Sequence, residues 1–305
     1  MTVKIYEDGS SYAWTPEMGE EGIVIRVSKS TVGSLGWCAQ QMWLEHNYPR
    51  PQELVKHLVV GDDVHNGLDL FYQKIEKQNR IMTIHQLKKN GAEMTEYLKK
   101  LIPTEKEIIE NRREENKDFP FYHNEYYYNM NWLMEFENAR IKMASDIFMP
   151  LANEVRLEVK MDMDIEGYGT IPVQFVGIID RVFDAVDGGM MLFELKTGKW
   201  KDGKASDMRK EMAYYKFLID HADPEYLKEN NINYPVTHWG WRFSAADFWM
   251  SEKVKKISER SMMKRMKDLI KMYLDNHFPP TKDDFKCSWC SMIELCPKYA
   301  IQVSE

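Results

Sequence analysis

The sequence lacks a membrane-spanning run and a secretory signal, and it contains only four cysteines. No apolar run approaches the roughly 20 residues that a membrane-spanning helix needs. The opening residues, MTVKIYEDGSSYAW, lack the basic and then apolar pattern of a secretory signal. We therefore expect a cytoplasmic protein without a membrane partner. Because thiols stay reduced in that compartment, the four cysteines are expected to bind a metal rather than to form disulfides.

Positive charge is not in excess either. The formal net charge is −7, which by itself argues against a nucleic-acid partner. A nuclease, however, needs clustered carboxylates for a divalent metal and basic side chains only along one groove. One stretch could supply such a groove: Lys253, Lys255, Lys256, Arg260, Lys264, Arg265, Lys267 and Lys271. Taken alone, this basic stretch is more readily interpreted as a solvated helix face.

Internal repeats and low-complexity linkers are also absent. The sequence has no phosphate-binding loop of the form G-x-x-x-x-G-K-[ST], so an ATP-driven helicase or recombination partner would be a separate chain. The chain is acidic and methionine-rich, which leads to the hypothesis that a phage or a mobile element encodes it.

The first part of the chain predicts short strands followed by helices. Strand-like runs lie at Val3–Tyr6 and Ile23–Val27. Ser28 or Ser30 is then suited to cap a helix that runs past Cys38.

A helical region follows. One helix is expected from Val59 to Lys77, and the pattern stays helical and charged from about 81 to 148. Within it, FYHNEYYYNMNW (121–132) gathers aromatic residues that could stack on the bases of a single strand. Aromatics at this spacing are more often packed core, and we favour that interpretation.

The pattern then changes to strands. Residues 154–165 alternate apolar and polar side chains, and the runs 171–186 and 190–197 are strand-like. Glycine-rich turns join the three, which predicts an antiparallel meander. A helix, a strand at 236–244 and a long basic helix complete the chain. This order predicts an α/β sandwich around a mixed central sheet.

Two acidic side chains and a lysine stand out at the ends of apolar strands. Asp180 ends the run GIID, and Glu194 and Lys196 lie in FELK on the next strand. Residues two apart on a strand share a face, and a hairpin would bring Asp180 beside them. A surface Glu–Lys pair is the alternative for so short a pattern. Burial of such charges in apolar strands without a metal or a partner is unfavourable, which supports a site.

Phosphodiester hydrolysis requires such a set of groups. Carboxylates suit Mg²⁺ or Mn²⁺, which acidify bound water. Lys196 could orient that water or offset charge on the phosphorane. The backbone carbonyl of Leu195 is a further candidate ligand.

The segment VGIIDRVFDAVDGGMMLFELKTGKW resembles the core of the RecB-type branch of PD-(D/E)XK nucleases. In that branch a G-x-x-D strand precedes a strand that ends in (D/E)-x-K-T-G. The resemblance implies a restriction-endonuclease-like fold. It also implies that Asp180 and Glu194 are metal ligands and that Lys196 is the catalytic lysine.

Two further elements of that branch have counterparts here. GDDVH matches a G-x-x-x-H motif of that branch. The resemblance implies that His65 is a third metal ligand. A lone histidine on a helix is more often a packing residue, which is the alternative. EMAYY places Tyr215 in the tyrosine position of a Q-x-x-x-Y motif, with Glu211 where the branch has glutamine. Glu211 could pair with Lys196 or extend the metal site. Glu158 resembles an acidic position of some relatives and is expected to play a supporting role at most.

The cysteines are divided between the two ends of the chain. Cys287, Cys290 and Cys296 form C-x2-C-x5-C, and Cys38 is the remaining candidate for a fourth ligand. Spacing and chemistry leave zinc and an iron–sulfur cluster equally open. The arrangement resembles the iron–sulfur clasp of AddB-type nuclease domains and of CRISPR-associated RecB-like exonucleases. That resemblance implies a [4Fe–4S] cluster.

Taken together, the residues and the resemblance predict one nuclease domain over 1–305. We assign residues 22–80 to the cysteine and histidine helices, 81–150 to a helical insertion, 151–250 to the nuclease core, and 251–305 to the basic helix and the clasp. The expected activity is metal-dependent exonucleolytic hydrolysis of single-stranded or frayed DNA ends, in recombination, repair or replication. A non-catalytic DNA-binding or assembly subunit is the alternative. A zinc-bound interaction module would leave the FELK strand unexplained.

Overall fold

The computed structural model describes residues 2–5, 12–15, 17–19, 22–48, 56–77, 94–114, 119–144, 147–233, 235–246 and 248–300. Its strands are β1 (Thr2–Ile5), β2 (Tyr12–Thr15), β3 (Glu17–Gly19), β4 (Gly22–Ser28), β5 (Ala152–Ile165), β6 (Gly169–Asp184), β7 (Met190–Lys196), β8 (Val236–Phe243) and β9 (Phe248–Lys253). Its α-helices are α1 (Lys29–Leu35), α2 (Ala39–Asn47), α3 (Lys56–Lys77), α5 (Met94–Lys100), α6 (Glu105–Glu114), α7 (His123–Ala144), α8 (Lys204–His221), α9 (Pro224–Glu229), α10 (Lys256–Asp275), α11 (Asp284–Ser288) and α12 (Pro297–Ala300). Short 3₁₀ turns are η3 (Ser244–Ala246) and η4 (Ile293–Leu295).

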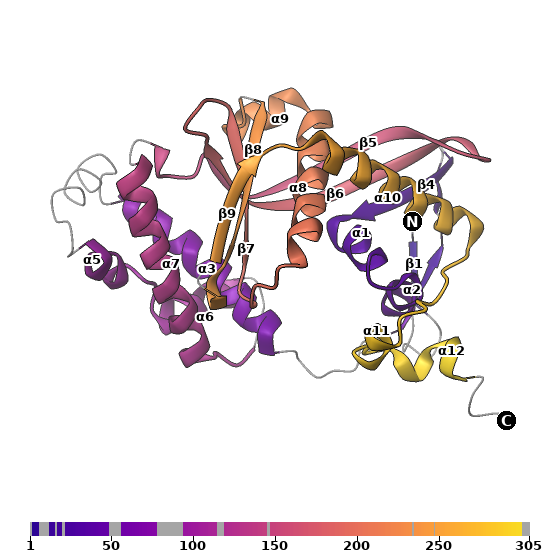
Figure 1. Cartoon of the computed structure of the whole chain (residues 1–305), viewed down its shortest axis with the longest axis horizontal. Helices are drawn as coiled ribbons and strands as arrows, with labels where there is room; N and C mark the ends of the chain where they lie inside the picture. The colour runs from indigo at the N-terminus through magenta and orange to yellow at the C-terminus, as the bar shows by residue number, and fades with distance from the viewer. Residues whose placement is uncertain are drawn as a thin grey trace.

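A mixed sheet lies at the centre of the molecule (Figure 1). The strand order is β3-β4-β6-β7-β8-β9, and β5 pairs with β6 beside this path. Strands β5, β6 and β7 form the predicted antiparallel meander. Strand β4 joins β6 in parallel, and β8 joins β7 in parallel. The predicted α/β class with a mixed sheet flanked by helices is therefore confirmed.

Helices cover both faces of the sheet (Figure 1). On one face, α8 and α10 pack over the strands and enclose the larger core, with Trp239 and Trp241 fully buried in it. On the other face, α3 and α7 enclose a second core that includes Leu195 of β7. Gly177 of β6 permits the close approach of α8, because a Cβ atom there would lie 2.7 Å from Leu218 Cδ1.

The N-terminal helix differs from the prediction, because it is divided in two. Ser28 caps α1, with its Oγ accepting from the backbone N–H of Thr31 at 3.2 Å. The helix ends at Leu35 with Gly36 as its C-cap, and Cys38 adopts an extended backbone and becomes the N-cap of α2. Glycine is a weak helix former, which favours a break at this point.

The long basic helix starts inside the basic stretch, because Lys253 and Lys255 both precede it. Strand β9, which the sequence pattern did not predict, ends at Lys253, and α10 begins at Lys256.

Of the helices that the structure describes, none combines the length and the hydropathy that a bilayer crossing would need.

Glu252 connects β8, β9 and α8 through one partly buried carboxylate. It accepts hydrogen bonds from Arg209 Nε at 2.5 Å, from Trp239 Nε1 at 3.0 Å and from Lys255 Nζ at 2.6 Å. Burial alone would raise the pKa of Glu252, but these donors outweigh it and lower the pKa to about 2. A carboxyl group with a lowered pKa stabilises the fold above its unfolded pKa, and this contribution is lost as the pH falls toward 2.

We therefore expect Glu252→Gln to lower the free energy of unfolding by about 2 kcal/mol at neutral pH. The difference from the wild type should shrink to about half that value near pH 3.5. Urea denaturation at several pH values measures both quantities. Glu110→Gln is the control, because Glu110 forms an exposed i,i+4 pair with Lys106, and such pairs contribute little. A pH-independent deficit in Glu252→Gln would contradict the assignment.

Candidate active site

Carboxylates from three neighbouring strands meet at one level of the sheet. The β5–β6 register sets Glu154 opposite Asp180. The β6–β7 register, continued by one residue, sets Glu194 on the other side of Asp180. The β6–β7 ladder stops just before this level, and Asp180 Oδ2 accepts instead from the backbone N–H of Leu195 at 2.8 Å. The strands therefore separate where the acidic side chains gather.

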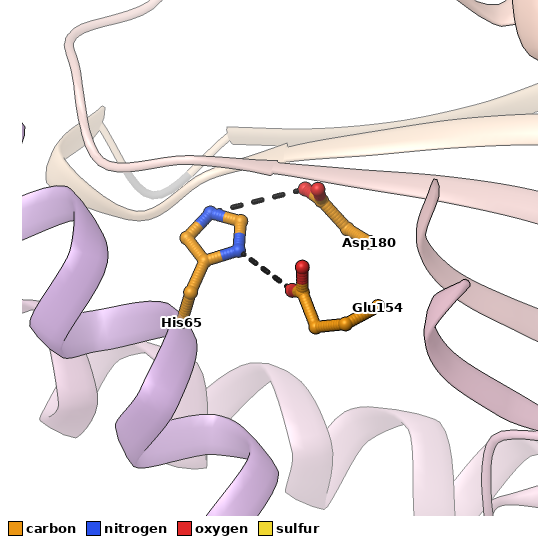
Figure 2. Close-up of side chains that lie close together, drawn as sticks. All are labelled: His65, Glu154 and Asp180. Carbon is orange, nitrogen blue, oxygen red and sulfur yellow. Dashed lines mark hydrogen bonds and ion pairs between the residues drawn. The ribbon is translucent and has the colours of Figure 1, made fainter. Parts of the chain in front are cut away.

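His65 reaches the same place from α3 (Figure 2). Its Nδ1 lies 3.3 Å from Glu154 Oε1, and its Nε2 lies 3.8 Å from Asp180 Oδ2. The Nε2 atom is also 3.2 Å from the carbonyl oxygen of Leu195. Potential ligand atoms of His65, Glu154 and Asp180 all lie within 4.8 Å of one another. An imidazole and two carboxylates at this spacing fit a divalent cation.

The backbone of Glu154 is strained in a way that suits this contact. Its φ of 46° lies in the left-handed region, which residues other than glycine rarely adopt. Arg181 donates to the same carboxylate at 3.3 Å and so holds it toward the site. Such strain is commonly found where function fixes a side chain. Sequence reasoning did not include Glu154 in the site.

Glu194 is in contact with two lysines. The side chain is only 2% exposed, and Oε1 accepts from Lys29 Nζ at 2.7 Å and from Lys196 Nζ. The other oxygen, Oε2, is buried and has no hydrogen-bond partner in the part of the chain that the structure describes. An orphaned carboxylate oxygen on a residue that lines the same cavity is a further fit to a bound cation. Glu194 itself is not in the described group whose ligand atoms all lie within 4.8 Å of one another.

The electrostatics of the two central acids differ. Burial and the nearby Glu194 raise the pKa of Asp180 to about 6. Burial would also raise the pKa of Glu194, but Lys196 and Lys29 reverse this and hold it at about 2. Glu194 is thus fixed in its ionised form by the lysines.

The remaining predicted residues surround this pair of lysines. Glu211 on α8 accepts from Lys196 at 3.0 Å and lies 3.7 Å from Lys29. Tyr215, one turn further along α8, is 1% exposed, and Lys29 Nζ lies 5.3 Å from the centre of its ring. The expected pairing of Glu211 with Lys196 is therefore present. Lys29 was not predicted, because it enters the site from a distant N-terminal segment.

Glu158 lies apart from these residues. It is exposed on β5 and accepts from Gln174 Nε2 at 2.5 Å. It does not line the cavity of about 1000 Å³ onto which His65, Glu154, Asp180, Glu194 and Lys196 open.

The basic stretch contributes one residue beside this site, because Arg265 lines an adjoining cavity together with Lys29 and Glu211. None of its eight basic residues, all of which the structure describes, lines the active-site cavity. Lys253 pairs with Asp187 at 2.9 Å, and Lys255 pairs with Glu252 at 2.6 Å. The cavity instead takes its positive charge from Lys29, Lys196 and Lys204.

The four cysteines come together at a separate place, between α2 and the C-terminal segment. All are free thiols, and Cys38, Cys287, Cys290 and Cys296 line one small cavity. Cys38 Sγ accepts from the backbone N–H of Thr281 at 3.3 Å, which joins the two ends of the chain. Figure 1 shows α11 and α12 beside α2.

Comparison with known proteins agrees with the acidic site. The sequence profile of the PD-(D/E)XK nuclease superfamily matches residues 26–297. The chain belongs to this superfamily. Membership supports a metal-dependent nuclease activity with DNA as the substrate, and the carboxylate–histidine cluster supplies a possible metal site.

Other comparisons are less informative about function. No curated protein matches the chain. The crystal structure of a protein designated SSO0001 is similar over 81% of this chain and 98% of its own, with 12% sequence identity and a TM-score of 0.35. A likeness at that level carries no argument about activity.

Proposed function

We propose that the chain is an exonuclease of the PD-(D/E)XK superfamily that hydrolyses phosphodiester bonds at single-stranded or frayed DNA ends. The observation that carries the proposal is the convergence of His65, Glu154 and Asp180 beside the Glu194–Lys196 pair. Mg²⁺ or Mn²⁺ would be held by the three converging side chains, by Oε2 of Glu194 and by the carbonyl of Leu195. A cation bound there would supply an activated water at neutral pH.

The lysines do the rest of the chemistry in this proposal. Lys196 carries its charge at the edge of the cavity and can donate a hydrogen bond to the attacking water or to a phosphoryl oxygen. Glu194 and Glu211 hold its ammonium group in place. Lys29 stabilises the ionised form of Glu194. These roles make Lys196 the residue to test first.

The test is incubation of end-labelled DNA with the anaerobically purified protein and Mg²⁺ or Mn²⁺. We expect release of short products from linear single strands, no cleavage of circular single strands, and no reaction in EDTA. Lys196→Ala should lower the rate by about 10²–10³-fold, whereas Lys228→Ala on the exposed helix α9 should not. Cleavage of circular single-stranded DNA would show that the protein is an endonuclease and not an exonuclease. Tight binding without cleavage would support the non-catalytic subunit instead.

We also propose that the four cysteines hold a [4Fe–4S] cluster that clasps the two ends of the chain. The four cysteines line one small cavity between α2 and the C-terminal segment, so a single four-thiolate group could bind all of them. Backbone N–H donors to Cys38 from Gln41 and Thr281 suit a cluster, whose sulfurs accept such bonds.

The cellular setting proposed for this activity is DNA recombination, repair or replication.

A further inference from the structure

A second cavity opens beside the active-site cavity and is lined by the helical insertion. Its volume is about 860 Å³, which is within the range of small-ligand sites. His57, Thr197 and Gly198 line both cavities, so the two are continuous. Because Thr197 directly follows Lys196, the second cavity begins one residue beyond the proposed catalytic lysine.

Tyr128 of α7 provides an aromatic wall for this second cavity. Its side chain is 52% exposed, whereas Tyr126 in the same aromatic cluster is fully buried. The hydroxyl of Tyr126 donates to the carbonyl oxygen of Pro103 at 3.1 Å, deep in the α3–α7 core. The aromatic cluster is therefore divided between a core tyrosine and a tyrosine that faces the cavity.

The polar groups around Tyr128 leave the cavity with little net charge. Lys56 and Glu125 form an ion pair with each other, and Lys56 Nζ also lies 4.9 Å from the ring of Tyr122. Val60 and Ala245 add apolar surface. A flat, uncharged and partly apolar group matches this lining better than a phosphate does, because a phosphate would require unpaired cations.

We propose that this cavity binds a nucleobase of the substrate strand, stacked on Tyr128, next to the phosphate that lies at the metal site. The inference rests on the proposed nuclease function and adds a base-binding subsite to it. Stacking on a tyrosine ring tolerates every base, because each base presents a π-face. The subsite would thus position a single strand without selecting its sequence.

Binding of single-stranded oligonucleotides that contain 2-aminopurine tests the subsite in EDTA, where the strand stays intact. We expect quenching of the fluorescence when the probe stacks on Tyr128. Tyr128→Ala should abolish the quenching and weaken binding about ten-fold, and Tyr128→Trp should retain both. Tyr168→Ala is the matched control, because Tyr168 is exposed on the β5–β6 hairpin, where it bonds to Asp275.

Cleavage assays with Mn²⁺ separate this inference from the nuclease function. Tyr128→Ala should reduce the preference for strands with a base next to the cleaved phosphate over strands with an abasic residue at that position, which leave the second cavity empty. If Tyr128→Ala behaves like Tyr168→Ala in both assays while the wild type degrades DNA, the proposed base-binding subsite is wrong and the proposed nuclease function is supported. If the fluorescence quenching depends on Tyr128 and the wild type does not cleave DNA, the base-binding subsite is supported and the proposed nuclease function is wrong.

Discussion

Asp180→Asn is expected to lower metal-dependent DNA cleavage by about 10³-fold, because the substitution removes the central carboxylate of the proposed cation site. The fold should survive. The asparagine oxygen can still accept the hydrogen bond that Leu195 N–H donates to Asp180. Burial and the neighbouring Glu194 raise the pKa of Asp180 to about 6, so the charged form is disfavoured in the metal-free fold. A neutral side chain there should leave the melting temperature unchanged or raise it.

Metal binding supplies a second measurement for this variant. A ligand that binds the folded state raises the melting temperature, so Mn²⁺ should stabilise the wild type and not Asp180→Asn. Glu154→Gln and Glu158→Gln form a matched pair on β5. The first should weaken the Mn²⁺ effect, since Glu154 lies against His65, and the second should not. If Mn²⁺ raises the melting temperatures of Glu154→Gln and Glu158→Gln equally, Glu154 is not a metal ligand. If Mn²⁺ raises the melting temperature of Asp180→Asn as much as that of the wild type, the proposed metal site is wrong.

The part of the site that lies on the meander could be predicted because strand geometry is local. Alternation places Glu194 and Lys196 on one face, and a hairpin brings Asp180 to their level. The same rule could have found Glu154. Glu154 and Asp180 are each thirteen residues from Gly167, at the centre of the β5–β6 turn, so a hairpin around that glycine sets them opposite each other.

Residues that reach the site through long-range contacts could not be predicted in this way. Lys29 lies 165 positions before Glu194 and comes to it because β4 pairs in parallel with β6. A parallel pairing leaves no turn signal between its strands. The break at Cys38 is a similar case, since the close packing of the C-terminal segment on α2 is not visible in local propensity. Gln40 N, for example, donates to the carbonyl of Pro279 at 3.3 Å.

The basic helix shows another limit, because its charge pattern does not say where in the fold the helix will pack. The charges of α10 are regularly spaced, but the helix packs on α8 and β4, across the sheet from α3 and α7. Its exposed lysines do not line the active-site cavity, whereas Arg265 lines a cavity that adjoins it.

Cys38→Ala is expected to remove iron and to lower the free energy of unfolding by about 3–5 kcal/mol. Cys38 is the ligand that comes from the N-terminal part of the chain, and the other three lie in the segment 287–296. A link between them closes nearly the whole chain into one loop, and cross-links across long loops restrict the unfolded ensemble most. Loss of Cys38 thus removes both a ligand and the closure.

Anaerobic iron and sulfide analysis, together with thermal unfolding of the same samples, tests this expectation. Ser288→Ala is the control, because Ser288 is exposed in the same segment and bonds only locally, to the carbonyl of Phe285. A brown wild-type protein that loses colour and stability in Cys38→Ala would support the cluster. If the analysis finds one zinc ion per chain and no sulfide, the four cysteines form a tetrahedral zinc site and not an iron–sulfur cluster. Full iron with an unchanged melting temperature in Cys38→Ala would mean that the ends are held by packing alone, through contacts such as that of Trp43 with Phe278.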